Sequence, residues 1–319
     1  MNTNFLIGIL AGLVTALLAS PLLVPDVMPV SVLVYFTPFP IFFVSLAWRH
    51  QTGLIASLVG ALALMLPTQN FSMGMVMLVG IGLPSWGLAY LLLLGRQTNR
   101  GMEWYPFGNI LFCLVLIASA LVAAILLVGS NLNYENYTAY INAMLDAAEP
   151  ALKESFQDNY DHDKFFMMLH SGLPSLQTSV IFLTLFLNLW LANRIASRTK
   201  RMPRPRVFVP ATRIPPAIMG IAFIGIALAF MDGLFGLIGL GIRSAVYLAL
   251  FIQGLMFIHF ATPQKPGRGL ILTAVYLTIG LTTALQTTVL IYALVGLGVV
   301  DILFNIRSKF GPANPAAPQ

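Results

Sequence analysis

The sequence predicts an all-α protein of the membrane, a polytopic bundle of about ten transmembrane helices with both termini in the cytoplasm. Of 319 residues, 58% are hydrophobic and only 9% are charged, whereas soluble domains carry about 25% charged residues. Apolar runs of about 15 to 22 residues recur along the chain, and about 20 apolar residues in a helix cross the ~30 Å hydrocarbon core of a bilayer. A water-soluble fold of this length has too little interior for so much apolar surface.

The expected spans are the apolar runs that charged residues, Pro or Gly separate. They cover 5–24, 30–48, 53–66, 73–95, 108–129, 173–194, 214–231, 243–262, 269–284 and 286–305, with boundaries good to about ±4 residues. The third and ninth runs are short, so a count of eight or nine spans is an alternative. No basic residue precedes the first run, and we therefore expect it to be a retained span rather than a cleaved signal.

The basic residues give the orientation, because Lys and Arg near span ends favour the cytoplasmic side. With a cytoplasmic N-terminus, fourteen of the 17 Lys and Arg residues fall in cytoplasmic loops or the tail. These are Arg49, Arg96, Arg100, Arg194, Arg198, Lys200, Arg201, Arg204, Arg206, Arg213, Lys265, Arg268, Arg307 and Lys309. A span count of the wrong parity would scramble this distribution. The formal charge of +6 is therefore attributed to topology in a bacterial inner membrane, and nucleic-acid binding is not expected.

The loops divide the chain into six expected regions. They are spans one to five at 1–129, an acidic periplasmic loop at 130–172, span six at 173–194, a basic Pro-rich cytoplasmic linker at 195–213, spans seven to ten at 214–306, and a cytoplasmic tail at 307–319. The periplasmic loop holds seven of the 11 acidic residues. Its apolar residues recur at three- and four-residue steps from Tyr137 to Phe156, which predicts an amphipathic helix interrupted near Pro150 and lying over the outer mouth of the bundle.

Familiar catalytic and cofactor motifs are missing from the sequence. It has no phosphate-binding glycine loop, zinc-protease helix or nucleophile elbow, and Cys113 is its only cysteine, so we expect neither an enzyme nor a cofactor. Asp161, His162 and Asp163, followed by His170, match no standard metal-site spacing. We expect no metal site there.

Polar residues inside or at the ends of spans are the better functional candidates, because a lone charge in lipid is costly and usually faces a partner or a cavity. These residues, considered as ligand-binding, are Asp232, Arg243, Gln253, His259, Gln286 and Asp301. Asp232 and Arg243 end successive spans on the outer side, and an ion pair between them is favoured over a ligand role. His259 and Asp301 lie at similar depth near the cytoplasmic side, where a direct contact and separate interfacial positions are equally open.

Two further surfaces suit partners. Gly8, Gly12 and Ala16 form a ridge of small residues on the first span. Intramolecular packing is the default for such a ridge, and docking of a partner helix is the alternative. The cytoplasmic basic patch, made of Arg198, Lys200, Arg201, Arg204 and Arg206, suits membrane anchoring first and anionic lipid or a protein partner second.

Three short signatures support a family resemblance. They are Leu187–Ala192 before the basic Pro-rich segment, Gln253–Leu255 with His259, and Gly296–Gly298 leading to Asp301 and Phe304–Arg307. With these the chain resembles the YybS-like family of bacterial multispanning membrane proteins, which is distantly similar to the substrate-binding S-components of energy-coupling-factor vitamin transporters. The resemblance implies docking of the Gly8 ridge on a transmembrane partner. S-components have about six spans, so their pocket residues do not map onto this chain.

Two functions follow as hypotheses. The first is a small-molecule-binding, transport-related subunit whose acidic loop covers an outward pocket, and which an ATPase module energises because the chain has no ATP site of its own. The second is a non-transport scaffold or accessory subunit of a membrane complex. A pocket beneath the outer loop favours the first, and a solid bundle core favours the second. An enzyme acting on lipid would need a richer polar cluster than His259 with Asp301.

Overall fold

The computed structural model describes residues 3–23, 28–99, 101–157, 160–205, 209–263, 265–285 and 289–310. The chain divides into two compact units. Unit 1 comprises Met1–Leu114 and Ile181–Val207, and unit 2 comprises Val115–Val180 and Phe208–Gln319. One boundary falls inside the basic linker expected at 195–213, but the other two fall inside helices that contribute to both units. The units are therefore not simply an N-terminal and a C-terminal half.

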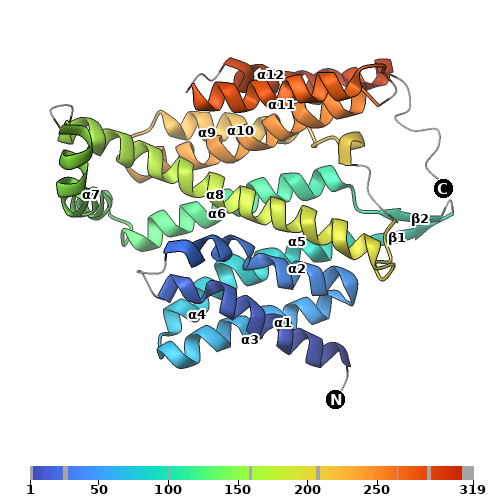
Figure 1. The fold of residues 1–319 in the computed structure, drawn as a ribbon, viewed down its shortest axis with the longest axis horizontal. Helices are drawn as coiled ribbons and strands as arrows, with labels where there is room; N and C mark the ends of the chain where they lie inside the picture. The colour runs from blue at the N-terminus through green and yellow to red at the C-terminus, as the bar shows by residue number, and fades with distance from the viewer. Residues whose placement is uncertain are drawn as a thin grey trace. The chain divides into compact units, whose positions relative to one another are not determined.

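Unit 1 contains the first five α-helices, coloured blue to cyan in Figure 1. They are α1 (Thr3–Ala19), α2 (Pro38–Ala47), α3 (His50–Thr68), α4 (Phe71–Met77) and α5 (Leu83–Leu93), with η1 (Ser20–Leu23) and η2 (Met28–Phe36) before α2 and the π-helical turn η3 (Leu78–Gly82) between α4 and α5. The second expected span is thus a 3-10 segment followed by a ten-residue α-helix. Pro38 and Pro40 lie in the first turn of α2, where proline needs no intrahelical hydrogen bond.

The small-residue ridge of α1 packs against α3 of the same chain. A Cβ atom on Gly12 would lie 2.7 Å from the Ala56 carbonyl oxygen and 2.7 Å from Val59 Cβ, so only glycine permits this approach. Gly8 meets α3 in the same way, and Ala16 is buried. The surface considered as a docking site for a partner helix is therefore covered by α3, in line with the intramolecular packing that the sequence favoured.

A β-hairpin interrupts the otherwise helical chain, in a place where the sequence suggested only a loop. Strand β1 (Gly95–Thr98) pairs antiparallel with β2 (Gly101–Trp104). Arg96 lies opposite Glu103, and their side chains form an exposed ion pair at 2.8 Å. Gly101 has a φ of 112°, which favours glycine at this tight turn.

Three helices supply the first part of unit 2, namely α6 (Phe107–Gly129), α7 (Tyr134–Phe156) and α8 (His162–Arg198). The start of α6 and the end of α8 belong to unit 1. Helix α7 is the amphipathic helix expected in the acidic loop, and it buries Tyr137, Ile141 and Leu145 along one face. The expected break at Pro150 is wrong, because α7 continues to Phe156. Pro150 is exposed, so water can satisfy the carbonyl group that it leaves without a donor.

Four further helices complete unit 2. They are α9 (Ile218–Ala229), α10 (Gly233–Ala261), α11 (Arg268–Ala284) and α12 (Val289–Phe304), with η5 (Val209–Ala211) before α9 and η6 (Ile306–Phe310) after α12. Figure 1 shows α9 and α12 alongside α10. Glycines allow these approaches, since a Cβ on Gly254 would lie 2.1 Å from the Leu294 carbonyl oxygen and a Cβ on Gly298 would lie 2.1 Å from that of Leu250.

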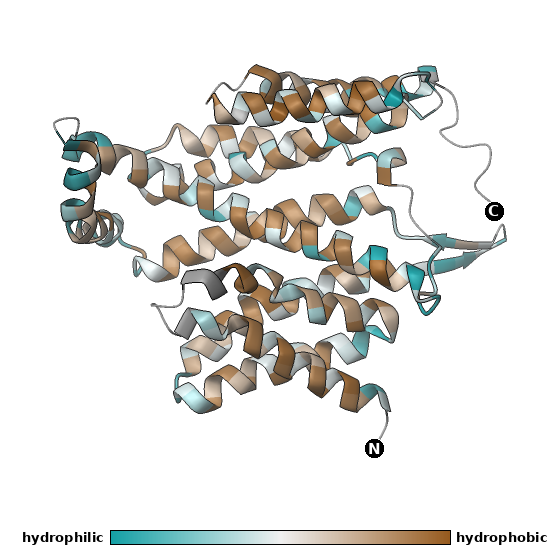
Figure 2. Cartoon of the chain, in the orientation of Figure 1, coloured by the Kyte–Doolittle hydropathy of each residue, from teal (hydrophilic) through white to brown (hydrophobic). Residues whose placement is uncertain are grey.

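The described helices fit a membrane protein. Five of them are long and apolar enough to cross a bilayer, and five shorter apolar helices accompany them; each of the ten overlaps one expected span. Figure 2 shows hydrophobic residues along the helices and hydrophilic ones gathered on α7 and around the hairpin. Phe230 and Val289 are 87% and 77% exposed, as lipid-facing side chains are. The protein is thus an all-α membrane protein with one added hairpin, while the number of crossings and the side of each terminus stay predictions.

Candidate functional site

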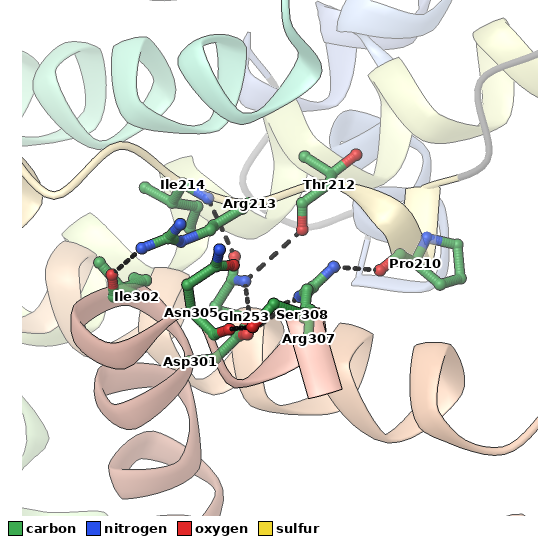
Figure 3. Close-up of polar contacts among 10 residues, drawn as sticks. All are labelled: Pro210, Thr212, Arg213, Ile214, Gln253, Asp301, Ile302, Asn305, Arg307 and Ser308. Atoms are coloured by element: carbon green, nitrogen blue, oxygen red, sulfur yellow. Dashed lines mark hydrogen bonds and ion pairs between the residues drawn. The ribbon is translucent and has the colours of Figure 1, made fainter. Parts of the chain in front are cut away.

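Two of the polar residues expected inside spans, Gln253 and Asp301, lie in direct contact in unit 2 (Figure 3). Gln253 is on α10 and Asp301 is on α12, and both are fully buried. The Gln253 side-chain amide donates a hydrogen bond to Asp301 Oδ2. The glycine contacts between α10 and α12, at Gly254 next to Gln253 and at Gly298 one turn before Asp301, bring the two helix backbones close enough for this bond.

Arg307 neutralises the buried Asp301 carboxylate. Helix α12 ends at Phe304, and Asn305 adopts a left-handed φ of 48°, a conformation that Asn tolerates at a helix end. The chain then turns back, so that Arg307 Nε donates to Asp301 Oδ1 at 3.0 Å and to Oδ2 at 2.7 Å. The Arg307 guanidinium also lies 5.0 Å from the centre of the Phe260 ring.

The cluster binds the end of the basic linker that precedes α9. The Ile214 amide donates to Gln253 Oε1 at 3.1 Å. Arg307 Nη1 donates to the Pro210 carbonyl, and Arg213 Nη2 donates to the Ile302 carbonyl. We call Gln253, Asp301, Arg307 and linker residues 210–214 the inner cluster. The Asp301 carboxylate is buried and paired with Arg307, whereas the half-buried Arg213 bonds to a backbone carbonyl and has no ion-pair partner among the described residues. The hydrogen bonds of the cluster hold the linker against α10 and α12.

The sequence identified Gln253 and Asp301 but missed Arg307 and Arg213. Both arginines fit the positive-inside pattern, which gave no reason to look for a second role. The available signal was local: an Asn directly after the helix that carries Asp301, with an Arg two residues further on.

His259 belongs to a different contact. Its Nε2 atom lies 2.8 Å from the Tyr276 hydroxyl oxygen on α11. Asp301 instead bonds to Gln253 and Arg307. The considered contact between His259 and Asp301 is therefore not formed, and the two residues occupy separate positions.

The expected ion pair between Asp232 and Arg243 is not formed either. The expected spans leave a connection at 232–242, but α10 begins at Gly233, which places Arg243 ten residues inside the helix. At 1.5 Å per residue, the two residues lie about 16 Å apart along the helix axis. Among the described residues the ion pairs are Arg96–Glu103, Glu149–Lys153 and Asp301–Arg307.

Arg243 instead lines a groove of about 480 Å³ between α8, α10 and α12. The groove, called the Arg243 groove below, is lined by Ser175, Arg243, Ser244, Tyr247, Ile291 and Tyr292. The Ser244 hydroxyl donates to the Ser175 carbonyl at 3.0 Å. The rings of Tyr247 and Tyr292 meet edge to face at 5.7 Å. The groove therefore combines one cationic side chain with hydroxyl groups and aromatic faces.

A second hollow lies beneath α7. This α7 cavity, of about 240 Å³, is lined by Ile125, Leu126, Gly129, Ser130, Tyr137, Tyr140, Leu173 and Gln177 from α6, α7 and α8. The Tyr137 hydroxyl donates to the His170 carbonyl at 2.8 Å, and the Tyr134 hydroxyl lies 2.9 Å from His170 Nε2. Burial raises the pKa of Tyr137, so its hydroxyl keeps the proton that it donates. These bonds hold α7 over the cavity.

The basic patch expected on the cytoplasmic side is only partly a free surface. Arg198 and Lys200 are exposed, and Arg201 lies 4.9 Å from the centre of the Trp48 ring. Arg204 is buried, and it donates to the Leu92 carbonyl at 2.9 Å. Arg206, like the span candidate Gln286, lies outside the described residues.

No group of three His, Cys, Asp or Glu side chains within the described part of the chain is placed to hold a metal ion. His170 bonds to Tyr134, and His162 Nδ1 lies 3.4 Å from the Tyr160 hydroxyl. Cys113 is half-buried within α6. The acidic loop thus uses its histidines in contacts with tyrosines.

Comparisons with known proteins address the family rather than the activity. Neither the curated proteins nor the solved structures gave a match. The finer resemblance to YybS-like proteins and S-components stays a prediction. Residues 7–302, nearly the whole chain, match the family described as Predicted membrane protein (DUF2232). The chain therefore belongs to this family of membrane proteins.

Proposed function

We propose that the protein is a small-molecule-binding, transport-related subunit of the bacterial inner membrane. The observation that carries the proposal is the α7 cavity. A binding subunit needs a pocket for its ligand, whereas a scaffold can have a solid core. Helix α7 covers such a pocket.

The lining of the α7 cavity suits a small, mostly apolar molecule. Most of the surface comes from aliphatic and aromatic side chains, and Ser130, Gln177 and the tyrosine hydroxyls provide a few polar groups. Ligand pockets commonly have this composition, with volumes from about 300 Å³ upward. At about 240 Å³ the cavity is slightly smaller, so a ligand would either be compact or would displace α7 as it enters.

Helix α7 is suited to act as a movable cover. Its packing against the bundle depends on one narrow face, formed by Tyr137, Ile141 and Leu145. Tyr140 and Met144, which directly precede Ile141 and Leu145 in the sequence, are exposed. A helix with one apolar face and few tertiary hydrogen bonds opens at lower free energy than the bundle core.

The experiment places a large side chain at a glycine that lines the cavity and has room for a Cβ atom. A Cβ atom on Gly129, which lines the cavity, would meet nothing within 4 Å, and the same holds for Gly172 outside it. The wild type, Gly129→Phe and the matched control Gly172→Phe are purified in mild detergent, and small molecules released by denaturation are identified by mass spectrometry. We expect a compound in the wild type and in Gly172→Phe that is missing from Gly129→Phe. Recovery of no compound from the wild type, or of equal amounts from both variants, would contradict the proposal.

Energy for transport would come from a partner. The sequence contains no phosphate-binding loop, so an ATPase module is the partner expected for active uptake. Proteins that copurify with the wild type in mild detergent are identified in the same preparations. Stoichiometric recovery of a nucleotide-binding subunit supports coupled transport, and its absence removes the transport part of the proposal while leaving ligand binding to the cavity test.

The alternative is a scaffold or accessory subunit, and the outward face of α7 favours it. Asp146 and Glu154 are exposed on this helix, and its acidic surface could recruit a basic protein. The double substitution Asp146→Asn, Glu154→Gln separates the functions. A scaffold would lose its copurifying protein, whereas the proposed binding subunit would keep its small molecule.

A further inference from the structure

Arg243 lies inside an apolar helix of the membrane. Helix α10 has 29 residues, and apart from Arg243 its sequence GLFGLIGLGIRSAVYLALFIQGLMFIHFA carries no Asp, Glu, Lys or Arg. The nine residues before Arg243 include Leu234, Phe235 and Leu237, and the following turn includes Val246 and Leu248. A cationic side chain is costly at such a position in the hydrocarbon core. Its presence therefore calls for a compensating interaction.

The described residues do not supply that interaction. The Arg243 side chain has no hydrogen bond or ion pair among them, and the acidic residue nearest to it in the helix sequence, Asp232, lies about three turns away. By contrast Arg307, which follows the end of α12, is paired with Asp301. We therefore infer that the negative charge that balances Arg243 belongs to a ligand.

The groove beside Arg243 has room for a headgroup. Its hydroxyl-bearing residues Ser175, Ser244, Tyr247 and Tyr292 come from three helices, and the remaining lining residue is Ile291. Tyr292 is 59% exposed, and Val289, one turn before it on α12, is 77% exposed. The groove is therefore bordered by side chains that face the lipid.

We propose that the Arg243 groove binds a phosphate group, and that the phosphate belongs to an anionic phospholipid or is a free phosphate ion. Guanidinium groups form two parallel hydrogen bonds with phosphate oxygens, and the hydroxyls of Tyr247 and Tyr292 can donate further bonds. An acyl chain would continue along the exposed apolar surface of α12. This site is separate from the α7 cavity, whose lining it does not share, and the proposal does not depend on the function proposed for that cavity.

The test is a titration of the purified full-length protein followed by native mass spectrometry. The probes are dioleoyl phosphatidylglycerol, dioleoyl phosphatidylcholine and inorganic phosphate. The proteins are the wild type, Arg243→Gln, Arg243→Lys and the matched control Arg194→Gln, which removes an equal charge from an exposed arginine stacked on Trp190 of α8. We expect phosphatidylglycerol to bind the wild type at least tenfold more tightly than phosphatidylcholine, and Arg243→Gln to lose this preference.

The control and the second variant keep the proposal falsifiable. Arg194→Gln should keep the wild-type preference, and Arg243→Lys should keep part of it, because an ammonium group retains the charge but not the two-point geometry. Tight binding of inorganic phosphate that Arg243→Gln abolishes also supports the site and identifies the free ion as its ligand. Equal binding of both lipids and no binding of inorganic phosphate by the wild type, or unchanged binding in Arg243→Gln, would overturn the proposal. If Arg243→Gln does not purify as a folded protein, the test rests on two other results. These are the preference of the wild type for phosphatidylglycerol and the partial loss of that preference in Arg243→Lys.

Discussion

Two arginines of unit 2 occupy opposite environments. Arg307 is 6% exposed, bonds both oxygens of Asp301 and lies against Phe260. Arg243 is exposed in a groove and has no bonded partner among the described residues. Both side chains carry the same charge, so the difference lies in what neutralises it.

This difference separates a structural role from a binding role. A buried charge that is paired within the chain is already neutralised, and removing one partner leaves the other charge buried without a counter-charge. A charge in an apolar helix that lacks an internal partner is available to something outside the chain. The inner cluster should thus respond to substitution with a loss of stability, and the Arg243 groove with a loss of binding.

The largest expected effect is that of Asp301→Asn. The substitution keeps the shape of the side chain but leaves the buried Arg307 guanidinium without its counter-charge, which typically costs about 3 to 5 kcal/mol. Thermal unfolding in detergent, followed by tryptophan fluorescence, should show a lower midpoint temperature. Asp232→Asn is the matched control, because Asp232 is exposed and makes no side-chain cap bond. Adding Arg307→Gln to Asp301→Asn should restore part of the stability, and a double variant less stable than both single variants would argue against the pair.

Gln253→Leu should have the second largest effect, on stability and on the linker together. The variant leaves the Ile214 amide without its buried acceptor and removes one donor from Asp301, at a cost of about 1 to 3 kcal/mol. The linker should then detach more often from the ends of α10 and α12. Limited trypsin digestion checks this, because cleavage after Arg213 should become faster while cleavage within the hairpin at Arg96 stays unchanged. Unchanged cleavage at Arg213 would mean that Gln253 does not hold the linker.

The fold was largely predictable because lipid imposes simple rules. Apolar length located all ten helical segments, and three- and four-residue spacing located α7. The errors occur where local chemistry overrides composition. The hairpin depends on cross-strand pairing of Arg96 with Glu103, and the early start of α10 depends on glycines that pack against α9, such as Gly239 against Ala229. Neither pairing can be found from hydropathy alone.

The candidate sites were predictable only in part. The rule that polar residues in spans are functional pointed to Gln253, Asp301 and Arg243, and the structure gives each a distinct environment. The pairing of Asp232 with Arg243 failed because α10 begins at Gly233 and separates the two residues along its axis. The pairing of His259 with Asp301 failed because depth in the membrane does not determine which face of a helix a residue occupies. Direction around the helix axis depends on tertiary packing, and a single sequence does not specify it.

A smaller effect is expected from His259→Phe. The substitution removes the bond between His259 and the half-exposed Tyr276 hydroxyl and keeps an aromatic ring in place. Hydrogen bonds between membrane helices average about 0.6 kcal/mol in double-mutant cycles. The unfolding midpoint should fall by much less than in Asp301→Asn. A fall as large as that of Asp301→Asn would show that His259 belongs to the inner cluster after all.

The smallest effect on stability is expected from Arg243→Gln, and this sharpens the comparison of the two arginines. Because Arg243 has no bonded partner among the described residues, its removal strands no opposite charge, and the free energy of unfolding in lipid-free detergent should change by less than about 0.5 kcal/mol. Added phosphatidylglycerol should then raise the unfolding midpoint of the wild type but not of the variant, because a ligand stabilises only the state that binds it. A large loss of stability without lipid would instead place Arg243 in the same structural class as Arg307.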